Sequence, residues 1–352
     1  MRRVPVFLSG AIVVVALGWI LRPVPGGAPR RAGPGTLAAT VVAPAIPAEA
    51  VSYADVLDIA DADVLGDRWF LLDRRASRVH VLGPEPGSLV SFGRSGIGPG
   101  ELTRPGALVL HGDTVVVVER LGGVLHRFNT AGRHLGDRRF EVGGCRVPVV
   151  SDAVSTPAGL VFLVTCPGVR LNTRAFAALE RPGYDARVLA STAARPSPFE
   201  GIDPHFTPVL ATHRDGIVFG AAGDECLSVM TLSGARSGVY CAGWLERLPL
   251  PEGDHEQLAR LRVRMAAFGA HLKATDALPP FDGLFPVGPA AYAFRTPTRL
   301  GGASRQLHFA PTGPDRGARL PVARYAFAGR GTALLGWESA GGIRIARYDL
   351  PD

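Results

Sequence analysis

The sequence predicts an all-β protein, a six-bladed β-propeller, on the basis of three observations. Short apolar or alternating runs recur between residues 50 and 350, separated by Gly, Pro, Asp and Ser. Two turn landmarks repeat along the chain at a spacing of roughly 40–50 residues, the length of a four-stranded blade. The last repeat is one strand short, so we expect a strand from the other end of the domain to complete it.

The first landmark is a Gly or Asp turn that opens a strand. It precedes six apolar runs, at Gly66, Gly112, Gly159, Gly216, Gly288 and Gly331, with intervals of 46, 47, 57, 72 and 43 residues. The second is a glycine turn between two strands, at Gly87, Gly132, Gly183, Gly234 and Gly313. Six strand-opening landmarks, five of them accompanied by the second landmark, predict six blades of four short strands.

The predicted propeller domain is 36–352. After the strand-like segment 343–348 the chain stops at Asp352, which leaves the last blade without an outer strand. The segment Leu37 to Ala43 is strand-like, and we expect it to fill this place. A ring closed by strands from both termini removes an exposed sheet edge.

Residues 1–35 predict export. Val4 to Leu21 is an apolar run of about 18 residues, longer than most signal-peptide cores and just long enough to span a bilayer as a helix. No small-x-small site follows closely, and no cysteine offers a lipoprotein anchor. Two interpretations stay open: an N-terminal apolar helix kept as a signal-anchor in the membrane, or a cleaved signal peptide, followed by a Pro/Gly/Arg-rich linker. Both predict an extracytoplasmic protein, periplasmic or on the cell surface.

The charge distribution argues against nucleic-acid binding. The formal net charge is +7, but residues 1–35 hold five arginines and no acid, which leaves +2 for residues 36–352. A nearly balanced domain lacks the electrostatic footprint that phosphate backbones require.

The four cysteines predict two disulfides. Cys145 and Cys166 are symmetric about the turn at 155–156, and Cys226 and Cys241 about the Ser233–Gly234 turn. Residues symmetric about a hairpin turn face each other across the strands, at a separation that suits a disulfide. Such bonds indicate an oxidising compartment. Four buried free thiols are the alternative.

The segment 92–102 reads F-G-R-S-G-I-G-P-G-E-L. It resembles the linker of bacterial six-bladed propellers related to NHL-repeat proteins, in which it joins the outer strand of one blade to the inner strand of the next. The resemblance implies the fold and says little of function.

The linker itself has a structural interpretation. Gly96, Gly98 and Gly100 permit close packing and positive φ, Pro99 fixes one φ, and we expect Glu101 to accept backbone N–H bonds. The pattern has no phosphate-loop lysine and opens no helix, so no nucleotide is predicted.

Other motifs fail. His255-Glu256 resembles the start of a zinc-protease helix, but the second histidine position holds Ala259. Asp58, Asp61 and Asp63 do not match a calcium loop, and we expect them to mark strand edges and a turn. No cofactor is predicted.

Four residues are candidates for a binding site at the channel mouth, because they fall at the ends of predicted inner strands: His111, Glu119, His205 and His213. A chance arrangement of scattered histidines is the alternative.

One helical insertion, 252–275, interrupts the repeat. Pro251 to Lys273 predicts a helix with Asp254 as N-cap, and an apolar stripe of Leu258, Leu261, Met265, Phe268 and Leu272. The stripe either packs on the propeller or docks a partner or an anionic membrane surface.

The functional hypothesis is a rigid scaffold that binds a protein, peptide or glycan, with no catalysis assigned. The alternative is a propeller hydrolase or lyase with a divalent metal, calcium or zinc, in the central channel.

Overall fold

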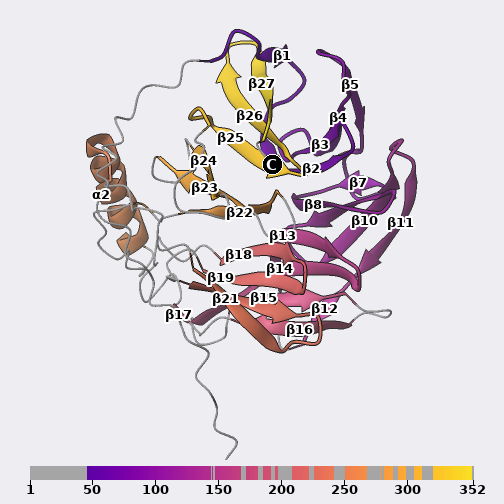
Figure 1. The fold of residues 1–352 in the computed structure, drawn as a ribbon, viewed down its shortest axis with the longest axis vertical. Coiled ribbons are helices and arrows are strands. Elements are labelled where there is room, and N and C mark those ends of the chain that lie inside the picture. The colour runs from indigo at the N-terminus through magenta and orange to yellow at the C-terminus, as the bar shows by residue number, and fades with distance from the viewer. Residues whose placement is uncertain are drawn as a thin grey trace, which may run out of the picture. The chain divides into compact units, whose positions relative to one another are not determined.

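The chain folds as a six-bladed β-propeller, within the compact unit Ala39–Asp352 (Figure 1). The structure is a computed structural model. It describes residues 46–143, 145, 147–167, 172–180, 185–191, 195–196, 208–221, 226–241, 250–267, 278, 281–287, 292–298, 305–310 and 320–350.

Blades 1 to 3 are antiparallel sheets in which strand order follows the sequence. Blade 1 contains β2 (Ile59–Leu65), β3 (Arg68–Asp73), β4 (Arg78–Leu82) and β5 (Leu89–Phe92). Blade 2 contains β8 (Pro105–His111), β9 (Thr114–Glu119), β10 (Val124–Asn129) and β11 (His134–Arg139). Blade 3 contains β13 (Val149–Thr156), β14 (Gly159–Pro167), β15 (Asn172–Leu179) and β16 (Asp185–Ser191), with the short strands β12 (Glu141–Val142) and β17 (Arg195–Pro196) added.

Blades 4 to 6 complete the ring. Blade 4 contains β18 (Pro208–His213), β19 (Gly216–Ala221), β20 (Cys226–Thr231) and β21 (Arg236–Cys241). Blade 5 contains β22 (Gly283–Pro286), β23 (Tyr292–Pro297) and β24 (Arg305–Ala310). Blade 6 contains β25 (Tyr325–Gly329), β26 (Thr332–Ser339), β27 (Gly342–Asp349) and, from the other end of the domain, β1 (Val51–Tyr53). The six predicted landmark strands are the second strands of the six blades.

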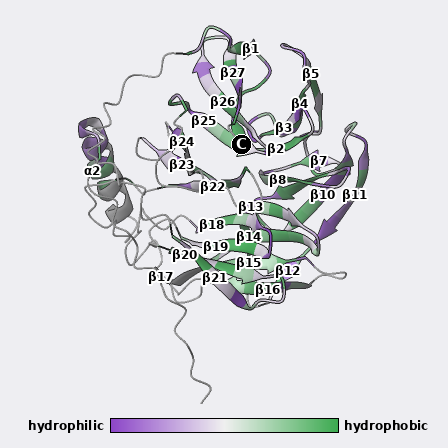
Figure 2. Cartoon of the chain, viewed as in Figure 1, coloured by the Kyte–Doolittle hydropathy of each residue, from purple (hydrophilic) through white to green (hydrophobic). Residues whose placement is uncertain are grey.

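The inner strands β2, β8, β13, β18, β22 and β25 contact one another in this order, and β25 contacts β2, so the ring is closed. Apolar residues gather in the strands, whereas α2 (Glu252–Ala267) is largely hydrophilic (Figure 2). Among the described residues, six clusters of buried apolar side chains each join two neighbouring blades.

The second strands show how this packing arises. In β3, Trp69 and Leu71 pack toward blade 6, whereas Phe70 and Leu72 pack toward blade 2. Successive side chains of a strand point to opposite faces, and both faces of a blade are covered by neighbours. The second strand is therefore a continuous apolar run. This run made the repeat visible in the sequence.

Closure by both termini is confirmed, but by a different strand from the one expected. Val51–Tyr53 pairs antiparallel with β27, with Val51 opposite Ile345. The predicted strand Leu37 to Ala43 lies outside the described residues. Tyr53 is buried between blades 6 and 1. The Arg344 guanidinium donates to the carbonyls of Ala50 (2.8 Å) and Pro47 (3.4 Å).

The linker joins β5, the outer strand of blade 1, to β8, the inner strand of blade 2. Its strands β6 (Arg94–Ser95) and β7 (Glu101–Leu102) pair in parallel. One Glu101 carboxylate oxygen accepts the Gly98 N–H (2.8 Å) and the other pairs with Arg94 (2.7 Å), so the predicted backbone bond of Glu101 is confirmed. A Cβ at Gly96 would lie 1.9 Å from Glu101 Oε2, so a side chain there would displace the Glu101 carboxylate from its bonds.

Both disulfides form with the predicted pairing. Cys226 and Cys241 are cross-strand neighbours in β20 and β21. Cys145 bonds Cys166, but from the segment before β13, because β13 begins at Val149 and a bulge shifts its register against β14. Symmetry about the hairpin turn therefore identified Cys166 as the partner of Cys145, although Cys145 lies outside the strand that pairs with β14.

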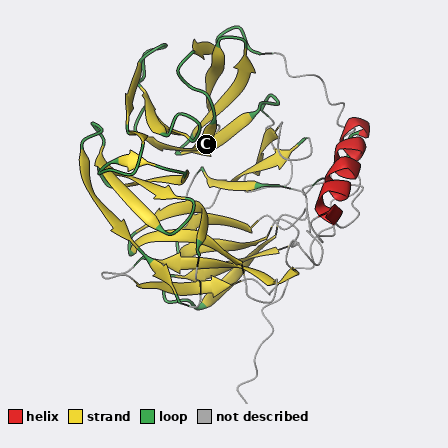
Figure 3. Cartoon of the chain, turned by 180° about the vertical axis from the view of Figure 1, so that it is seen from behind, coloured by secondary structure: helices red, strands yellow, loops and turns green. Residues whose placement is uncertain are grey.

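The predicted helix is confirmed over α2, Glu252–Ala267, with a different first turn, and its predicted continuation over 268–275 lies outside the described residues. Pro251 carbonyl oxygen accepts the N–H groups of Asp254 (2.8 Å) and His255 (3.3 Å), so Asp254 lies inside the first turn and its prediction as N-cap is wrong. Proline is favoured where a helix begins, because its missing N–H would have no partner there. Figure 3 shows α2 as the helix of the described region.

Of the predicted apolar stripe, Leu258 is buried. The side chains of Leu261, Met265, Phe268 and Leu272 lie outside the described residues. Within the described part of the chain, no helix has the length and apolarity needed to cross a membrane. The apolar segment from Val4 to Leu21 is not part of it.

We predict that β1 holds the ring closed. A chain that starts at Asp55 loses Tyr53 burial and the Arg344 bonds, and its Tm should fall by about 10 °C below that of a chain starting at Ile46. Arg344→Ala keeps the strand but loses the guanidinium bonds, so its Tm should lie between the two. Differential scanning calorimetry provides the measurement, and equal melting of the two truncated chains would contradict closure by β1.

Candidate functional site

The predicted channel-mouth residues do not form one site. His111 ends β8, and its Nδ1 lies 2.9 Å from Ser155 Oγ of blade 3. His213 ends β18, and its Nδ1 accepts the Asp215 N–H (3.1 Å). In the β8–β9 pair, His111 lies opposite Thr114 and Glu119 opposite Pro105, so Glu119 lies at the other end of the blade. His205 is outside the described residues.

Glu119 instead anchors the linker to blade 2. It ends the second strand, and its carboxylate accepts the N–H groups of Thr103 (2.7 Å) and Arg104 (2.5 Å). Its Oε1 also lies 3.3 Å from His126 Nε2. Burial opposes ionisation, but the bonds to His126 and to the two backbone groups outweigh it and lower the pKa of Glu119.

Blade 1 contains the same arrangement. Asp73, at the end of β3, accepts the N–H groups of Leu57 (2.6 Å) and Ala76 (2.8 Å), and lies 3.4 Å from His80 Nε2. His80 Nδ1 lies 2.7 Å from Ser91 Oγ on the outer strand. An acid on the second strand and a histidine on the third are therefore a repeated structural tether.

A second group of carboxylates lies on the inner strands β2 and β13. Asp61 on β2 accepts the N–H of Leu108 on β8 (2.7 Å), and Asp63 accepts the N–H of Leu110 (2.9 Å). They mark a strand edge, as expected, since an inner strand has unpaired N–H groups that need acceptors. However, they lie inside β2 rather than in a turn, and Asp58 precedes the strand.

These carboxyl groups shift one another's pKa. Burial raises the pKa of Asp61 well above its ordinary value, and the charge of Asp152 on β13 raises it further. Burial also raises the pKa of Asp152, to about 7, although the Arg295 charge opposes this. The carboxylates of β2 and β13 are thus close enough for their charges to interact.

A larger charged group lies at the N-terminal ends of the inner strands of blades 5, 6 and 1. We call it the mouth cluster: Asp58, Arg74, Asp282, Arg295, Arg305, Arg324, Tyr325 and Glu338. Its partly buried base is the Asp282 carboxylate, which pairs with Arg295 Nε (2.6 Å) and Arg305 Nε (3.0 Å). Burial opposes ionisation of Asp282, but the two guanidinium groups outweigh it and lower the pKa.

Hydrogen bonds make the mouth cluster continuous across blades. Arg305 Nη1 donates to the Arg324 carbonyl oxygen (2.9 Å), joining blade 5 to blade 6. The Tyr325 hydroxyl donates to Asp58 Oδ1 (3.4 Å), joining blade 6 to blade 1. Ion pairs extend it outward, Arg74 to Asp58 (2.9 Å) and Arg324 to Glu338 (3.1 Å).

The mouth cluster combines fixed and accessible charges. The Asp282 side chain is 14% exposed, whereas Arg74 is 46% and Arg324 41% exposed. Arg295 lies over the rings of Phe285 and Phe327 (5.4 and 5.7 Å), which hold the guanidinium in place. Burial, and then the charge of Arg295, lowers the pKa of Arg305, because the guanidinium groups repel each other.

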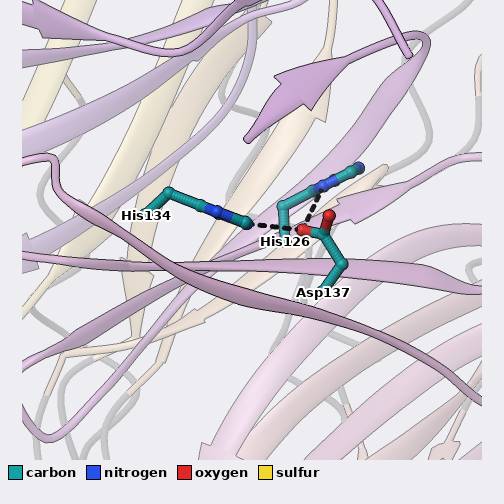
Figure 4. A group of neighbouring side chains, drawn as sticks. All are labelled: His126, His134 and Asp137. Carbon is teal, nitrogen blue, oxygen red and sulfur yellow. Dashed lines mark hydrogen bonds and ion pairs between the residues drawn. The ribbon is translucent and has the colours of Figure 1, made fainter. Parts of the chain in front are cut away.

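A second polar group lies on the outer half of blade 2 (Figure 4). Asp137 Oδ1 lies 2.8 Å from His126 Nδ1 and 2.7 Å from His134 Nε2. Burial opposes protonation of His126, but its bonds to Glu119 and Asp137 outweigh this and raise its pKa. For Asp137 burial also opposes ionisation, but the two histidines lower its pKa.

This group was not predicted from the sequence, although a signal for it existed. His126 and Asp137 are opposite residues of the β10–β11 hairpin, symmetric about its Ala131–Gly132 turn. The symmetry used to pair the cysteines would have paired them. His134, three residues before Asp137, then completes the group.

Comparison with known proteins shows low similarity. No family model matches the chain, and no curated protein matches it. Among solved structures, a protein of Bacteroides fragilis assigned as exported aligns at 10% identity and TM-score 0.49, over 86% of this chain and 94% of that one. A chain of a nidogen/laminin complex aligns at 13% identity and TM-score 0.42, over 72% and 76%. PorZ, a surface component of the type-IX secretion system of Porphyromonas gingivalis, aligns at 10% identity and TM-score 0.35, over 83% and 33%.

We predict that Asp152→Asn stabilises the protein at alkaline pH. The folded chain holds a proton on Asp152 that the unfolded chain releases between about pH 4 and pH 7, so this group's contribution to stability is lost as pH rises through that window. The neutral amide keeps the acceptor for the Ala153 N–H and removes the buried charge. Its Tm should exceed wild type by about 2–5 °C at pH 8 and match it at pH 4.

The exposed Asp55→Asn is the control and should change Tm at neither pH. A loss of stability in Asp152→Asn at pH 8 would contradict the sign of the prediction.

Proposed function

We propose that this protein is an extracytoplasmic propeller scaffold that binds a protein, peptide or glycan at the mouth cluster. The observation that carries the proposal is that some charged groups of that cluster are held in place by contacts while others are accessible to solvent. Asp282 holds Arg295 and Arg305 by ion pairs within blade 5, and a hydrogen bond from Arg305 to the Arg324 carbonyl oxygen ties this base to blade 6. Arg74, Arg324 and Glu338, by contrast, extend into solvent. Groups held in place before binding lose little conformational entropy when a ligand arrives.

The chemistry suits polar, partly anionic ligands. Guanidinium groups present several N–H donors in a plane and bind carboxylates or sulfates through two bonds at once. Glu338 adds an acceptor for hydroxyl or amide groups. Acidic side chains of a partner and acidic sugars of a glycan offer the complementary groups.

The two disulfides support the extracytoplasmic part of the proposal. The first, Cys145–Cys166, ties the segment before β13 to β14 of blade 3, and the second, Cys226–Cys241, joins two strands of blade 4. Structural disulfides persist in oxidising compartments and are rare in the cytosol. The apolar segment Val4 to Leu21 is proposed as the membrane anchor or signal peptide, and the kinship with NHL-repeat propellers is part of the same proposal.

His111 and His213 stay candidates for a second contact region. Both lie at C-terminal ends of inner strands, whereas the mouth cluster lies at N-terminal ends. The inner strands of a propeller all run in the same direction along the central axis. The two histidines and the mouth cluster therefore belong to opposite faces of the propeller.

The test is site-specific photo-crosslinking in the native host. A photoreactive residue replaces Arg74 or Arg324 at the mouth cluster, and Arg236 on the outer strand β21 as the control. All three side chains are accessible, so each variant should keep a Tm within about 2 °C of wild type. Crosslinked products are expected from positions 74 and 324 and absent from position 236. No products at the mouth, or equal products at all three positions, would overturn the proposal.

A further inference from the structure

We propose that His126, His134 and Asp137 form a metal site that binds one Zn²⁺ ion on the outer half of blade 2. The site is separate from the central channel and from the mouth cluster. It rests on three observations: convergence of the ligand atoms, the position of Glu119, and the comparison with blade 1.

The three side chains converge from two adjacent strands (Figure 4). His126 projects from β10, and His134 and Asp137 from β11. One ligand atom of each residue lies within 4.8 Å of the other two. Zinc holds imidazole nitrogen and carboxylate oxygen at about 2.0–2.2 Å. An ion between them therefore requires the side chains to separate by a small distance, which is accessible to Asp137 and His134 because both are partly exposed.

His126 lies between two carboxylates. Glu119 Oε1 lies 3.3 Å from its Nε2, and Asp137 Oδ1 lies 2.8 Å from its Nδ1. When Nε2–H donates to Glu119, the Nδ1 lone pair faces a carboxylate oxygen. That contact is repulsive unless a proton or a metal ion lies between the two atoms.

A metal ion at that position completes a common second-shell arrangement. Histidines that bind metals donate their other ring N–H to a carboxylate or carbonyl, which fixes the tautomer and the ring orientation. Glu119 supplies this carboxylate, and backbone N–H groups of Thr103 and Arg104 hold it in place.

Blade 1 shows that the tether does not itself require a metal. His80 lies opposite Ser91 in β4–β5, as His126 lies opposite Asp137 in β10–β11. The Ser91 hydroxyl both donates and accepts, so it satisfies His80 Nδ1 without a cation. Blade 2 replaces this serine by a carboxylate and adds His134. The tether in blade 1 forms without these two additions, and metal binding accounts for both of them together.

The donor set selects the metal. Two imidazole nitrogens and one carboxylate suit zinc and neighbouring transition metals, whereas calcium and magnesium prefer oxygen ligands alone. Three protein ligands leave a fourth tetrahedral position, which solvent or a ligand can take. The exposed side of Asp137 provides access to it.

The first experiment titrates the purified full-length protein with ZnCl₂ against a chromogenic chelator at pH 7.5. We expect one Zn²⁺ per chain with a Kd of about 1 μM or tighter, and no competition from millimolar Ca²⁺. His134→Ala and Asp137→Ser should each weaken binding at least tenfold. Asp137→Ser restores the residue that blade 1 has at this position, so its fold is expected to persist.

The control is His255→Ala, on the exposed surface of α2, which should bind zinc as wild type does. Circular dichroism and Tm of the apo variants show whether each remains folded. Absence of wild-type binding up to about 100 μM Zn²⁺, unchanged affinity in both ligand variants, or equal competition by Ca²⁺ would each overturn the proposal.

A second measurement locates the ion. Anomalous scattering at the zinc edge from crystals soaked in ZnCl₂ should place a peak within about 2.3 Å of His126 Nδ1, His134 Nε2 and Asp137. A peak elsewhere, with none between these three residues, would overturn the assignment.

Discussion

Burial of both faces of every blade is the constraint on which the rest of this structure depends. Each second strand sends alternate side chains to the neighbour on either side, as Phe70 and Trp69 do in β3. In the described part of the chain, each cluster of buried apolar residues belongs to two blades, so a blade completes its core only with its neighbours. The ring must therefore close, and β1 in blade 6 closes it.

Closing the ring leaves backbone N–H groups of the inner strands without partners in a neighbouring strand. Buried donors without partners are costly. Asp61 and Asp63 solve this by accepting N–H groups of β8. The consequence is a set of carboxylates with raised pKa values on the inner strands, which arise from architecture and need no ligand to explain them.

The same separation of roles runs through both candidate sites. In the mouth cluster, Asp282 and its two arginines join blades, and the accessible charges extend from that base. In blade 2, Glu119 and His126 repeat the tether seen at Asp73 and His80, and Asp137 and His134 are additions to it. A tether shared by blades 1 and 2 thus becomes, in blade 2, the support for two residues that blade 1 lacks.

The sequence by itself determined the repeat, the disulfide partners and one contact of the linker. The spacing of turn glycines, the continuous apolar second strands, the disulfide partners and the Glu101 bond in the linker all follow from local patterns. They depend on residues close in sequence, or on symmetry about a single turn, so no knowledge of the ring is required.

The tertiary structure decided what depends on distant segments. Which N-terminal strand closes blade 6 depends on how Tyr53 packs between two blades, and not on strand propensity, which Leu37 to Ala43 also has. The mouth cluster brings together Asp58 and Tyr325, 267 residues apart. The candidate channel residues separated for the same reason: His111 and Glu119 are close in sequence, but antiparallel pairing places them at opposite ends of a blade. Convergence of side chains from several blades has no local signature, because it is set by ring closure and strand register.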